Sequence, residues 1–212
     1  MSTAETTAPA KEWWGSCKVD VPEGESGVCR VERYTVTREE SEWGRVRAIA
    51  SFSSRGRYVR EGTYTRLRRY GETIMSDTND EIRDHYPPIL RAKRVDGGLC
   101  LINGLGLGMV TQSVLVVNPA VRVRVVEQSP DVIALVAPHY RERFGDRFEV
   151  VQADAFDYKP TKGERYVVVW HDIWDNICGD NLPEMARLHR KYARRADWQG
   201  SWGRDECRRL VR

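Results

Sequence analysis

Apolar residues in the central part of this chain form short runs that are separated by stretches with helical spacing. Four of these runs have the length and composition of strands, and they lie at residues 99–103, 121–126, 148–151 and 166–170. Between the first three runs, apolar residues recur every three to four positions over 109–117 and 129–145. Strands that alternate with helices in this way predict an α/β fold around a parallel sheet with right-handed crossovers.

The N-terminal part has a different pattern, in which apolar and polar residues alternate with a period of two. Three segments show this pattern and are rich in β-branched or aromatic side chains, namely residues 28–36, 46–52 and 58–65. They predict a small antiparallel sheet or hairpins that end near Gly71. Residues 1–12 have too few large apolar side chains to fold and are expected to form a flexible tail. The expected domains are this tail, a small β-rich region over 13–71 and a main domain over 72–212.

Further helices are expected on both sides of the central pattern. Residues 76–81 offer helix caps and first-turn acids, and a helical pattern follows as far as Ala92 with a kink at two prolines. Residues 181–184 have the pattern of a capping box, residues 198–203 are expected to form a loop, and residues 205–211 a last helical segment. The helix after 181 has a basic stripe, formed by Arg187, Arg190, Lys191 and Arg194. A solvated helix face is the favoured interpretation of this stripe, and a phosphate contact is the alternative.

Charge gives little support to a nucleic-acid-binding function. The 34 Lys and Arg residues exceed the 31 Asp and Glu residues by only three charges, which is too few to indicate such a protein by bulk charge. Arginines between residues 55 and 69 could form a phosphate-binding face, but solvated residues on the outer face of strands are the favoured interpretation. Nucleic acid is therefore a possible partner but not the favoured one.

Cysteine and histidine usage points to a protein of a reducing compartment. The five cysteines are odd in number, widely spaced and without a CxxC pair, and the four histidines are scattered, so no metal site is expected. No apolar run is long enough to span a bilayer, and the first residues lack a signal-peptide core. We therefore expect a cytoplasmic protein without a membrane partner.

Residues that could bind a ligand or take part in a reaction follow each predicted strand of the central pattern. Gly104, Gly106 and Gly108 follow the first strand. Glu127 follows the second strand, 23 positions after Gly104, and Asp154 follows the third. The fourth strand leads into His171, Asp172, Trp174 and Asp175. Ligands of open parallel sheets bind at the carboxyl ends of the strands, where a glycine turn admits a nucleotide and an acid can bind ribose hydroxyls. Each feature alone is also explained as an ordinary turn, a loop cap or strand-end packing, but their combination favours a nucleoside site.

In this order of features the chain resembles the class I S-adenosylmethionine-dependent methyltransferases, and more particularly their spermidine synthase-like branch. Residues 101–108, 125–133 and 152–156 carry the resemblance, which covers about residues 72 to 185. It implies a Rossmann-like methyltransferase fold that follows a small N-terminal antiparallel β-region, with S-adenosylmethionine as the cofactor. The cofactor-binding residues that it implies are Asn103, Gly104, Leu105, Gly106, Gly108, Glu127, Gln128, Asp154, Ala155 and Asp172.

The sequence departs from the spermidine synthase-like pattern in two respects. The branch carries an Asp-Glu-x-x-Tyr-His-Glu segment, which residues 80–86 match only in part, and Gly106 falls where aminopropyltransferases have an aspartate. These differences disfavour polyamine synthesis. The second departure is one of length, because only about forty residues follow Trp170. The sheet is therefore expected to be truncated at its C-terminal side or completed by a partner chain. A homo-oligomer is one possible form of such a partnership.

The resemblance implies methyl transfer to an acceptor that the sequence does not identify. Because the cofactor sulfonium supplies the reactivity, the protein has to align the acceptor and, where needed, remove a proton. Asp172 could orient or deprotonate an amine or hydroxyl, His171 could act as a base, and Trp174 could stack on a planar acceptor, with Asp175 beside them. Two alternatives stay open, which are an aminopropyltransferase-like activity and a non-catalytic S-adenosylmethionine-binding regulatory or assembly protein.

Overall fold

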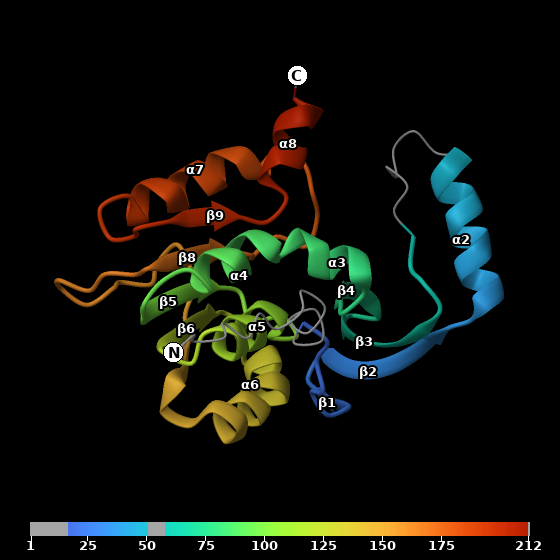
Figure 1. The fold of residues 1–212 in the computed structure, drawn as a ribbon, viewed down its shortest axis with the longest axis horizontal. Helices are drawn as coiled ribbons and strands as arrows, with labels where there is room; N and C mark the ends of the chain where they lie inside the picture. Colours follow the sequence, from blue (N-terminus) through green and yellow to red (C-terminus); the bar gives the residue numbers. More distant parts are fainter. Residues whose placement is uncertain (1–16, 51–57, 212) are drawn as a thin grey trace, which may run out of the picture.

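The computed structural model describes residues 17–50 and 58–211, and a five-stranded parallel sheet lies at its centre (Figure 1). The strands have the order β7-β6-β5-β8-β9, and their bounds are β5 (Gly98–Asn103), β6 (Val121–Glu127), β7 (Phe148–Gln152), β8 (Val168–His171) and β9 (Gln199–Ser201). From β5 the chain adds strands first on one side and then on the other. The carboxyl ends of β5, β6 and β8 therefore flank the switch point at which such sheets bind ligands.

Helices cover both faces of this sheet, as expected for a Rossmann-like fold. Their bounds are α3 (Asn79–Asp84), α4 (Tyr86–Ala92), α5 (Met109–Val117), α6 (Pro130–Phe144), α7 (Asn181–Tyr192) and α8 (Arg204–Leu210). Buried residues of α4, α5 and α6 pack with Cys100 and Ile102 on one face. Leu188 and Tyr192 of α7 pack with Leu101 and Val169 on the other face. The expected α/β fold with a parallel sheet is thus confirmed.

A second, antiparallel sheet precedes the parallel sheet, as the period-two pattern predicts. Its strands, in the order β1-β2-β3-β4, are β1 (Gly24–Ser26), β2 (Cys29–Val36), β3 (Gly62–Arg69) and β4 (Glu72–Ser76). β4 begins after Gly71 and pairs with β3, so the small sheet extends to Ser76. Val31 and Leu67 of this sheet belong to the same hydrophobic cluster as the α4–α6 face of the main sheet. The expected tail at 1–12 lies outside the described residues.

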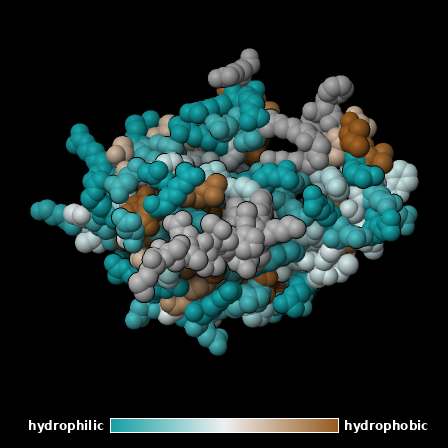
Figure 2. Space-filling view, in the orientation of Figure 1, coloured by the Kyte–Doolittle hydropathy of each residue, from teal (hydrophilic) through white to brown (hydrophobic). Residues whose placement is uncertain are grey.

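The strand predicted at residues 46–52 is wrong as far as the structure describes it, because residues 46–50 belong to helix α2 (Arg38–Ala50). Thr37 and Glu40 form a reciprocal cap at its start, in which Glu40 accepts hydrogen bonds from the backbone and hydroxyl of Thr37. This cap favours a helix over the local alternation. α2 extends away from the main sheet in Figure 1, and Figure 2 shows hydrophobic side chains gathered toward its end. The structure leaves Trp43, Val46 and Ile49 exposed.

The segment expected to form a loop at 198–203 contains strand β9, which pairs with β8 in parallel. The three residues of β9, Gln-Gly-Ser, have no apolar alternation, so only their pairing with β8 identifies them as a strand. Gly200 lies against the rings of Trp170 and Trp198, which are stacked 6.3 Å apart. The sheet therefore has one strand more than the four that the apolar runs predict.

Within residues 17–50 and 58–211, no helix combines the length and the apolar character that crossing a membrane requires.

The turn between β5 and α5 is packed against α6. Gly108 has a left-handed backbone (φ +74°), and a Cβ atom there would overlap the ring of Tyr140. The Tyr140 hydroxyl in turn donates a hydrogen bond of 2.8 Å to the Leu107 carbonyl. Tyr140 is fully buried, so its ring cannot move aside without disturbing the core.

We expect Gly108→Ala to lower the free energy of unfolding by about 2–4 kcal/mol, because the left-handed conformation and the displaced ring each cost about 1–2 kcal/mol. The matched control is Gly163→Ala, since Gly163 also has a positive φ (+81°) but no atom within 4 Å of an added Cβ. This control should lose only about 1–2 kcal/mol. Urea unfolding of both variants measures the difference, and equal losses would contradict the role of Tyr140.

Candidate functional site

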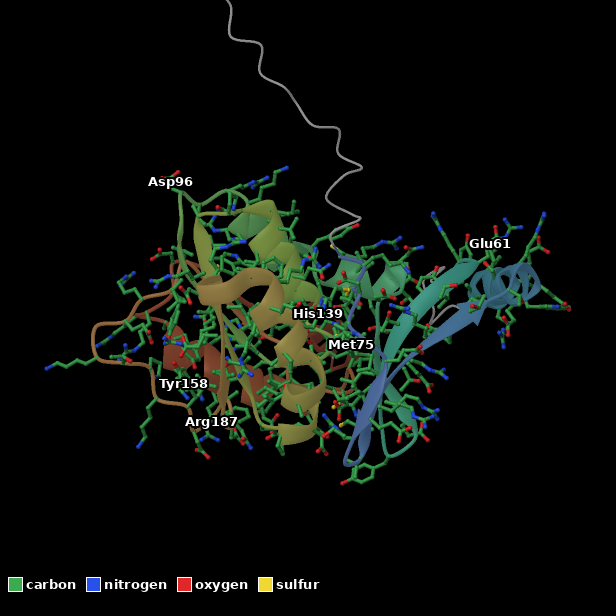
Figure 3. All side chains as sticks on the ribbon, turned by 90° about the horizontal axis from the view of Figure 1, so that it is seen from below. Glu61, Met75, Asp96, His139, Tyr158 and Arg187 are labelled. Atoms are coloured by element: carbon green, nitrogen blue, oxygen red, sulfur yellow. The ribbon has the colours of Figure 1, made fainter. Side chains whose placement is uncertain are left out.

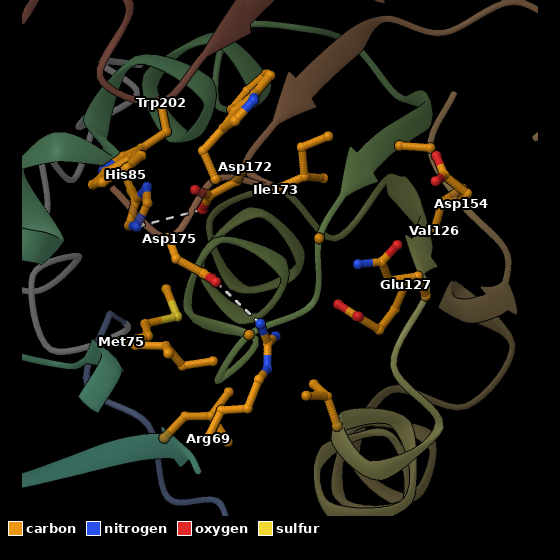
Figure 4. Close-up of a pocket in the computed structure, with 18 of the residues that line it drawn as sticks. Arg69, Met75, His85, Val126, Glu127, Asp154, Asp172, Ile173, Asp175 and Trp202 are labelled. Atoms are coloured by element: carbon orange, nitrogen blue, oxygen red, sulfur yellow. Dashed lines mark hydrogen bonds and ion pairs between the residues drawn. The ribbon is translucent and has the colours of Figure 1, made fainter. Parts of the chain in front are cut away.

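A cavity of about 590 Å³ opens at the carboxyl ends of the parallel strands (Figure 4). This volume lies in the usual range for small-molecule sites. The cavity is lined by residues of the turn between β5 and α5 (residues 104–108, the glycine loop) and of β6. Residues of the loops after β7 and β8, of α3 and of the small sheet also line it. The predicted site residues that line it are Gly104, Gly106, Glu127, Gln128, Asp154, Ala155, Asp172, Trp174 and Asp175. The structure therefore brings together most of the residues that follow the four predicted strands.

The glycine loop needs its first two glycines for close packing. A Cβ atom at Gly104 (φ +98°) would overlap the carbonyl oxygen of Asp172, which follows β8. A Cβ atom at Gly106 (φ +50°) would overlap the sulfur of Met75, from β4. That sulfur also accepts a hydrogen bond from the Leu107 backbone at 3.3 Å. The loop thus contacts both the β8 end and the small sheet, and Figure 3 shows Met75 where the small sheet meets the main body.

Glu127 is held rigidly at the end of β6. One of its carboxylate oxygens accepts a hydrogen bond from the Leu105 backbone and the other from the Ser129 backbone, both at 2.8 Å. These bonds tie the acid to the glycine loop on one side and to the start of α6 on the other. A carboxylate has further lone pairs, so Glu127 can still accept hydrogen bonds from a ligand in the cavity.

The loop after β7 provides a wall with an apolar part. Asp154 is exposed and accepts a hydrogen bond of 2.6 Å from the Phe156 backbone, so it caps its own turn as well as lining the cavity. The ammonium group of Lys191, on α7, donates to the carbonyls of Ala155 and Phe156, each at 2.9 Å. Arg187 lies 4.7 Å from the Phe156 ring centroid. Two residues of the basic stripe on α7 therefore hold this loop.

Acidic groups from α3 and from the β8 end meet at the opposite side of the cavity. Burial raises the pKa of Asp172 to about 7, and the nearby charge of Asp84 acts in the same direction. Burial also raises the pKa of Glu81 to about 7, although the Ser76 backbone and hydroxyl donate hydrogen bonds of 2.7 and 2.6 Å to it. The His85 ring lies 3.6 Å from the Asp172 carboxylate, and its burial lowers its pKa to about 4. At neutral pH this side of the cavity holds a neutral imidazole and two carboxyl groups that are partly protonated.

Two polar contacts cross the loop after β8. The Trp174 indole N–H donates to Glu184 of α7 at 2.8 Å. The Arg69 guanidinium, at the end of β3, pairs with Asp175 at 3.1 Å, and Figure 4 shows this pair beside the glycine loop. The first contact directs Trp174 toward α7, and the second joins the small sheet to the loop after β8.

His171 does not lie where its expected role as a base requires, and this is a correction to the sequence-based expectation. Its side chain is fully buried, its Nδ1 lies 2.7 Å from the Asn103 amide, and burial lowers its pKa to about 3. A base must reach the proton that it removes, and His171 does not line the cavity. Asn103, Leu105 and Gly108 also do not line it. Leu105 still contributes through its backbone N–H to Glu127.

Sequence reasoning did not assign a site role to several residues that line the cavity. These are chiefly Arg69, Met75, Glu81, Asp84, His85 and Trp202. Glu81, Asp84 and His85 lie in residues 80–86, whose partial match to a segment of the spermidine synthase-like branch was the available signal. Arg69, Met75 and Trp202 have no comparable signal, because they reach the cavity only through the packing of the small sheet and of the segment after β9.

Comparisons with known proteins show similarity only at the level of structure. No protein-family model matches the sequence, and no curated protein matches it. Solved structures that match are class I S-adenosylmethionine-dependent methyltransferases. Coclaurine N-methyltransferase, described with SAH bound, is 24% identical, with 45% of this chain and 27% of that chain covered and a TM-score of 0.38. A putative O-methyltransferase from Nostoc punctiforme is 19% identical, with 52% and 33% covered and a TM-score of 0.42.

A putative RNA methyltransferase from Pyrococcus horikoshii is 16% identical, with 61% of this chain and 64% of that chain covered and a TM-score of 0.46. The chain matches about a quarter to a third of the length of the coclaurine and Nostoc enzymes. None of these three structures points to the spermidine synthase-like branch.

The buried carboxyl group of Asp172 makes stability depend on pH. Its folded-state pKa of about 7 exceeds the ordinary value of 3.8, so the folded state keeps the proton to higher pH than the unfolded state. The free energy of unfolding therefore falls as the pH rises from about 4 to about 7, by about 1.4 kcal/mol for each unit of pKa difference.

We expect Asp172→Asn to abolish this contribution, so that its advantage over the wild-type chain in free energy of unfolding grows by about 2–3 kcal/mol from pH 5 to pH 8. Glu81 keeps a smaller dependence of the same sign in both proteins. Asp175→Asn removes a carboxylate of the same loop that is 58% exposed, and it serves as the control. Urea unfolding at pH 5, 6, 7 and 8 measures the effect. Parallel profiles for wild type and Asp172→Asn would refute the raised pKa.

Proposed function

We propose that this protein is an S-adenosylmethionine-dependent methyltransferase. The observation that carries the proposal is the rigid carboxylate of Glu127, which is tied to the glycine loop through the Leu105 backbone and faces the cavity at the end of β6. An acid at this place in a parallel sheet can accept a hydrogen bond from a ribose hydroxyl. The cavity has the volume for such a ligand.

The residues of the cavity fit an adenosyl ligand with a charged amino-acid end. Ala155, Phe156 and Val126 provide apolar surface beside Glu127 for a purine ring. Gly104 and Gly106 line the cavity without a side chain, which leaves the loop backbone accessible to a ligand. When bound, the cofactor would supply a methyl group on a positively charged sulfur. The carboxyl groups around Asp172 provide negative charge opposite Glu127, which suits a ligand of this charge.

We assign Asp172 the role of the residue that orients the acceptor and accepts its proton. It is 16% exposed, lies on the cavity wall and has a pKa of about 7, which is suited to proton transfer near neutral pH. His85 lies 3.6 Å from its carboxylate. Trp174 and Trp202 line the same region and offer flat surfaces for an acceptor.

A second candidate function is aminopropyl transfer to an amine. The observation that favours it is the grouping of Glu81, Asp84 and Asp172 on one side of the cavity, which suits a polyamine-like acceptor. Gly106 disfavours it, because the resemblance places there an aspartate that holds the amine of the decarboxylated cofactor. An amine is also an acceptor for methyl transfer, so the acidic grouping is compatible with the first proposal.

Isothermal titration calorimetry with S-adenosylmethionine, its decarboxylated form and S-adenosylhomocysteine tests the cofactor. We expect Glu127→Gln to weaken binding of S-adenosylhomocysteine by about 10- to 100-fold, because hydrogen bonds to a charged acceptor are worth about 1.5–3 kcal/mol. Glu149→Gln is the control, since Glu149 is a 53% exposed acid on β7 that pairs with Arg124. If the wild-type protein binds none of the three ligands, the proposal fails. If it binds the decarboxylated form best, the second candidate is correct.

A turnover assay with small amines, nucleosides, RNA and peptides as acceptors tests the reaction. We expect Asp172→Asn to lower kcat by about 100-fold or more once an acceptor is known, as is typical for loss of general-base catalysis. Its affinity for S-adenosylhomocysteine should stay within about threefold of the wild-type value, since that change is under 0.7 kcal/mol. Full turnover by this variant would exclude Asp172 as the proton acceptor. Binding without turnover on any acceptor would favour a regulatory cofactor-binding protein.

A further inference from the structure

Negative charge dominates the lining of the cavity. Seven carboxyl groups line it, from Glu81, Asp84, Glu127, Asp154, Asp172, Asp175 and Glu184. Among the described lining residues, the basic side chains are those of Arg69 and His85. Because His85 is buried and its pKa lies near 4, its ring is neutral at pH 7. Arg69 is therefore the one permanent positive charge among these described residues.

Arg69 is placed by the alternation of side chains along β3. Neighbouring residues of a strand point to opposite faces of the sheet, and Arg68 is bonded to the Gly71 carbonyl and to Glu32, away from the cavity. Arg69 instead lines the cavity and pairs with Asp175. This pair is 29% exposed at Arg69 and 58% exposed at Asp175. Exposed ion pairs are weak, so a ligand carboxylate can replace Asp175 at little cost.

We propose that Arg69 binds the carboxylate at the amino-acid end of the cofactor and thereby selects the carboxylated adenosyl ligand over its decarboxylated form. This inference rests on the proposed cofactor. The sulfonium and ammonium groups of such a ligand are attracted by the carboxyl groups of the cavity, whereas its carboxylate is repelled by them. Without a fixed cation, the cavity would favour the decarboxylated ligand.

The guanidinium group suits this role by its shape as well as by its charge. Its N–H groups form a planar fork that binds both oxygens of a carboxylate at once. Arg69 lies at the end of β3, and Met75 on the adjacent strand β4 contacts the glycine loop. Figure 4 shows Arg69 and Met75 entering the cavity from the same side. The small N-terminal sheet therefore completes the cofactor site and decides which form of the ligand is accepted.

Calorimetry of the full chain with S-adenosylhomocysteine and with its decarboxylated analogue tests the inference. The wild-type protein is expected to bind S-adenosylhomocysteine about 10- to 100-fold more tightly, which is the effect of one good charge-assisted pair. Arg69→Gln should weaken binding of S-adenosylhomocysteine by about the same factor. The same variant should bind the decarboxylated analogue within about threefold of wild type, because that ligand has no carboxylate to lose.

Arg68→Gln is the matched control, since it removes the neighbouring guanidinium on the face of β3 directed away from the cavity. It should leave both affinities unchanged. Equal binding of the two ligands by the wild-type protein, or an equal loss of both in Arg69→Gln, would overturn the role of Arg69 but leave the proposed cofactor intact. Failure of the wild-type protein to bind either ligand would overturn the proposed function and this inference together. The wild-type comparison decides the selectivity even if Arg69→Gln does not fold.

Discussion

The geometry of the site depends on the hydrogen bond between the Leu105 backbone and the Glu127 carboxylate. This bond joins the turn after β5 to the end of β6, and the close approach of Gly104 to the Asp172 carbonyl joins the same turn to the end of β8. Three strand ends are thus held as one unit. A side chain at Gly104 would separate them, because the turn has no space for a Cβ atom and its backbone is left-handed.

Burial of acids around this unit has opposite effects on stability and on chemistry. Desolvation of Asp172 and Glu81 raises both pKa values to about 7, so their ionisation at neutral pH opposes folding. The same desolvation makes Asp172 a better proton acceptor than an exposed aspartate. Arg69 and Met75 bring the small sheet into this arrangement, so that region contributes to the site as well as to the core.

Local sequence patterns predicted the elements whose signals are strong and failed where packing decided. The central strands and the turns after them follow from apolar or alternating segments that end in glycines or acids. Residues 46–50 alternate like a strand but are helical, because the cap between Thr37 and Glu40 starts a helix before them. Strand β9 has no pattern of its own and exists through its pairing with β8. His171 is the last residue of β8, but its side chain is buried against Asn103 and does not line the cavity.

The Rossmann-like order of strands and helices can be predicted from the sequence alone, as can the places of Gly104, Glu127, Asp154 and Asp172 at successive strand ends. Those features depend on hydrophobic periodicity and on turn residues, which are local properties of the chain. That the side chains of Arg69 and Glu81 reach the same cavity as Asp172 is a result of tertiary packing. Their positions depend on how the small sheet and α3 pack against the parallel sheet, and contacts between residues so far apart leave no periodic signal in the sequence.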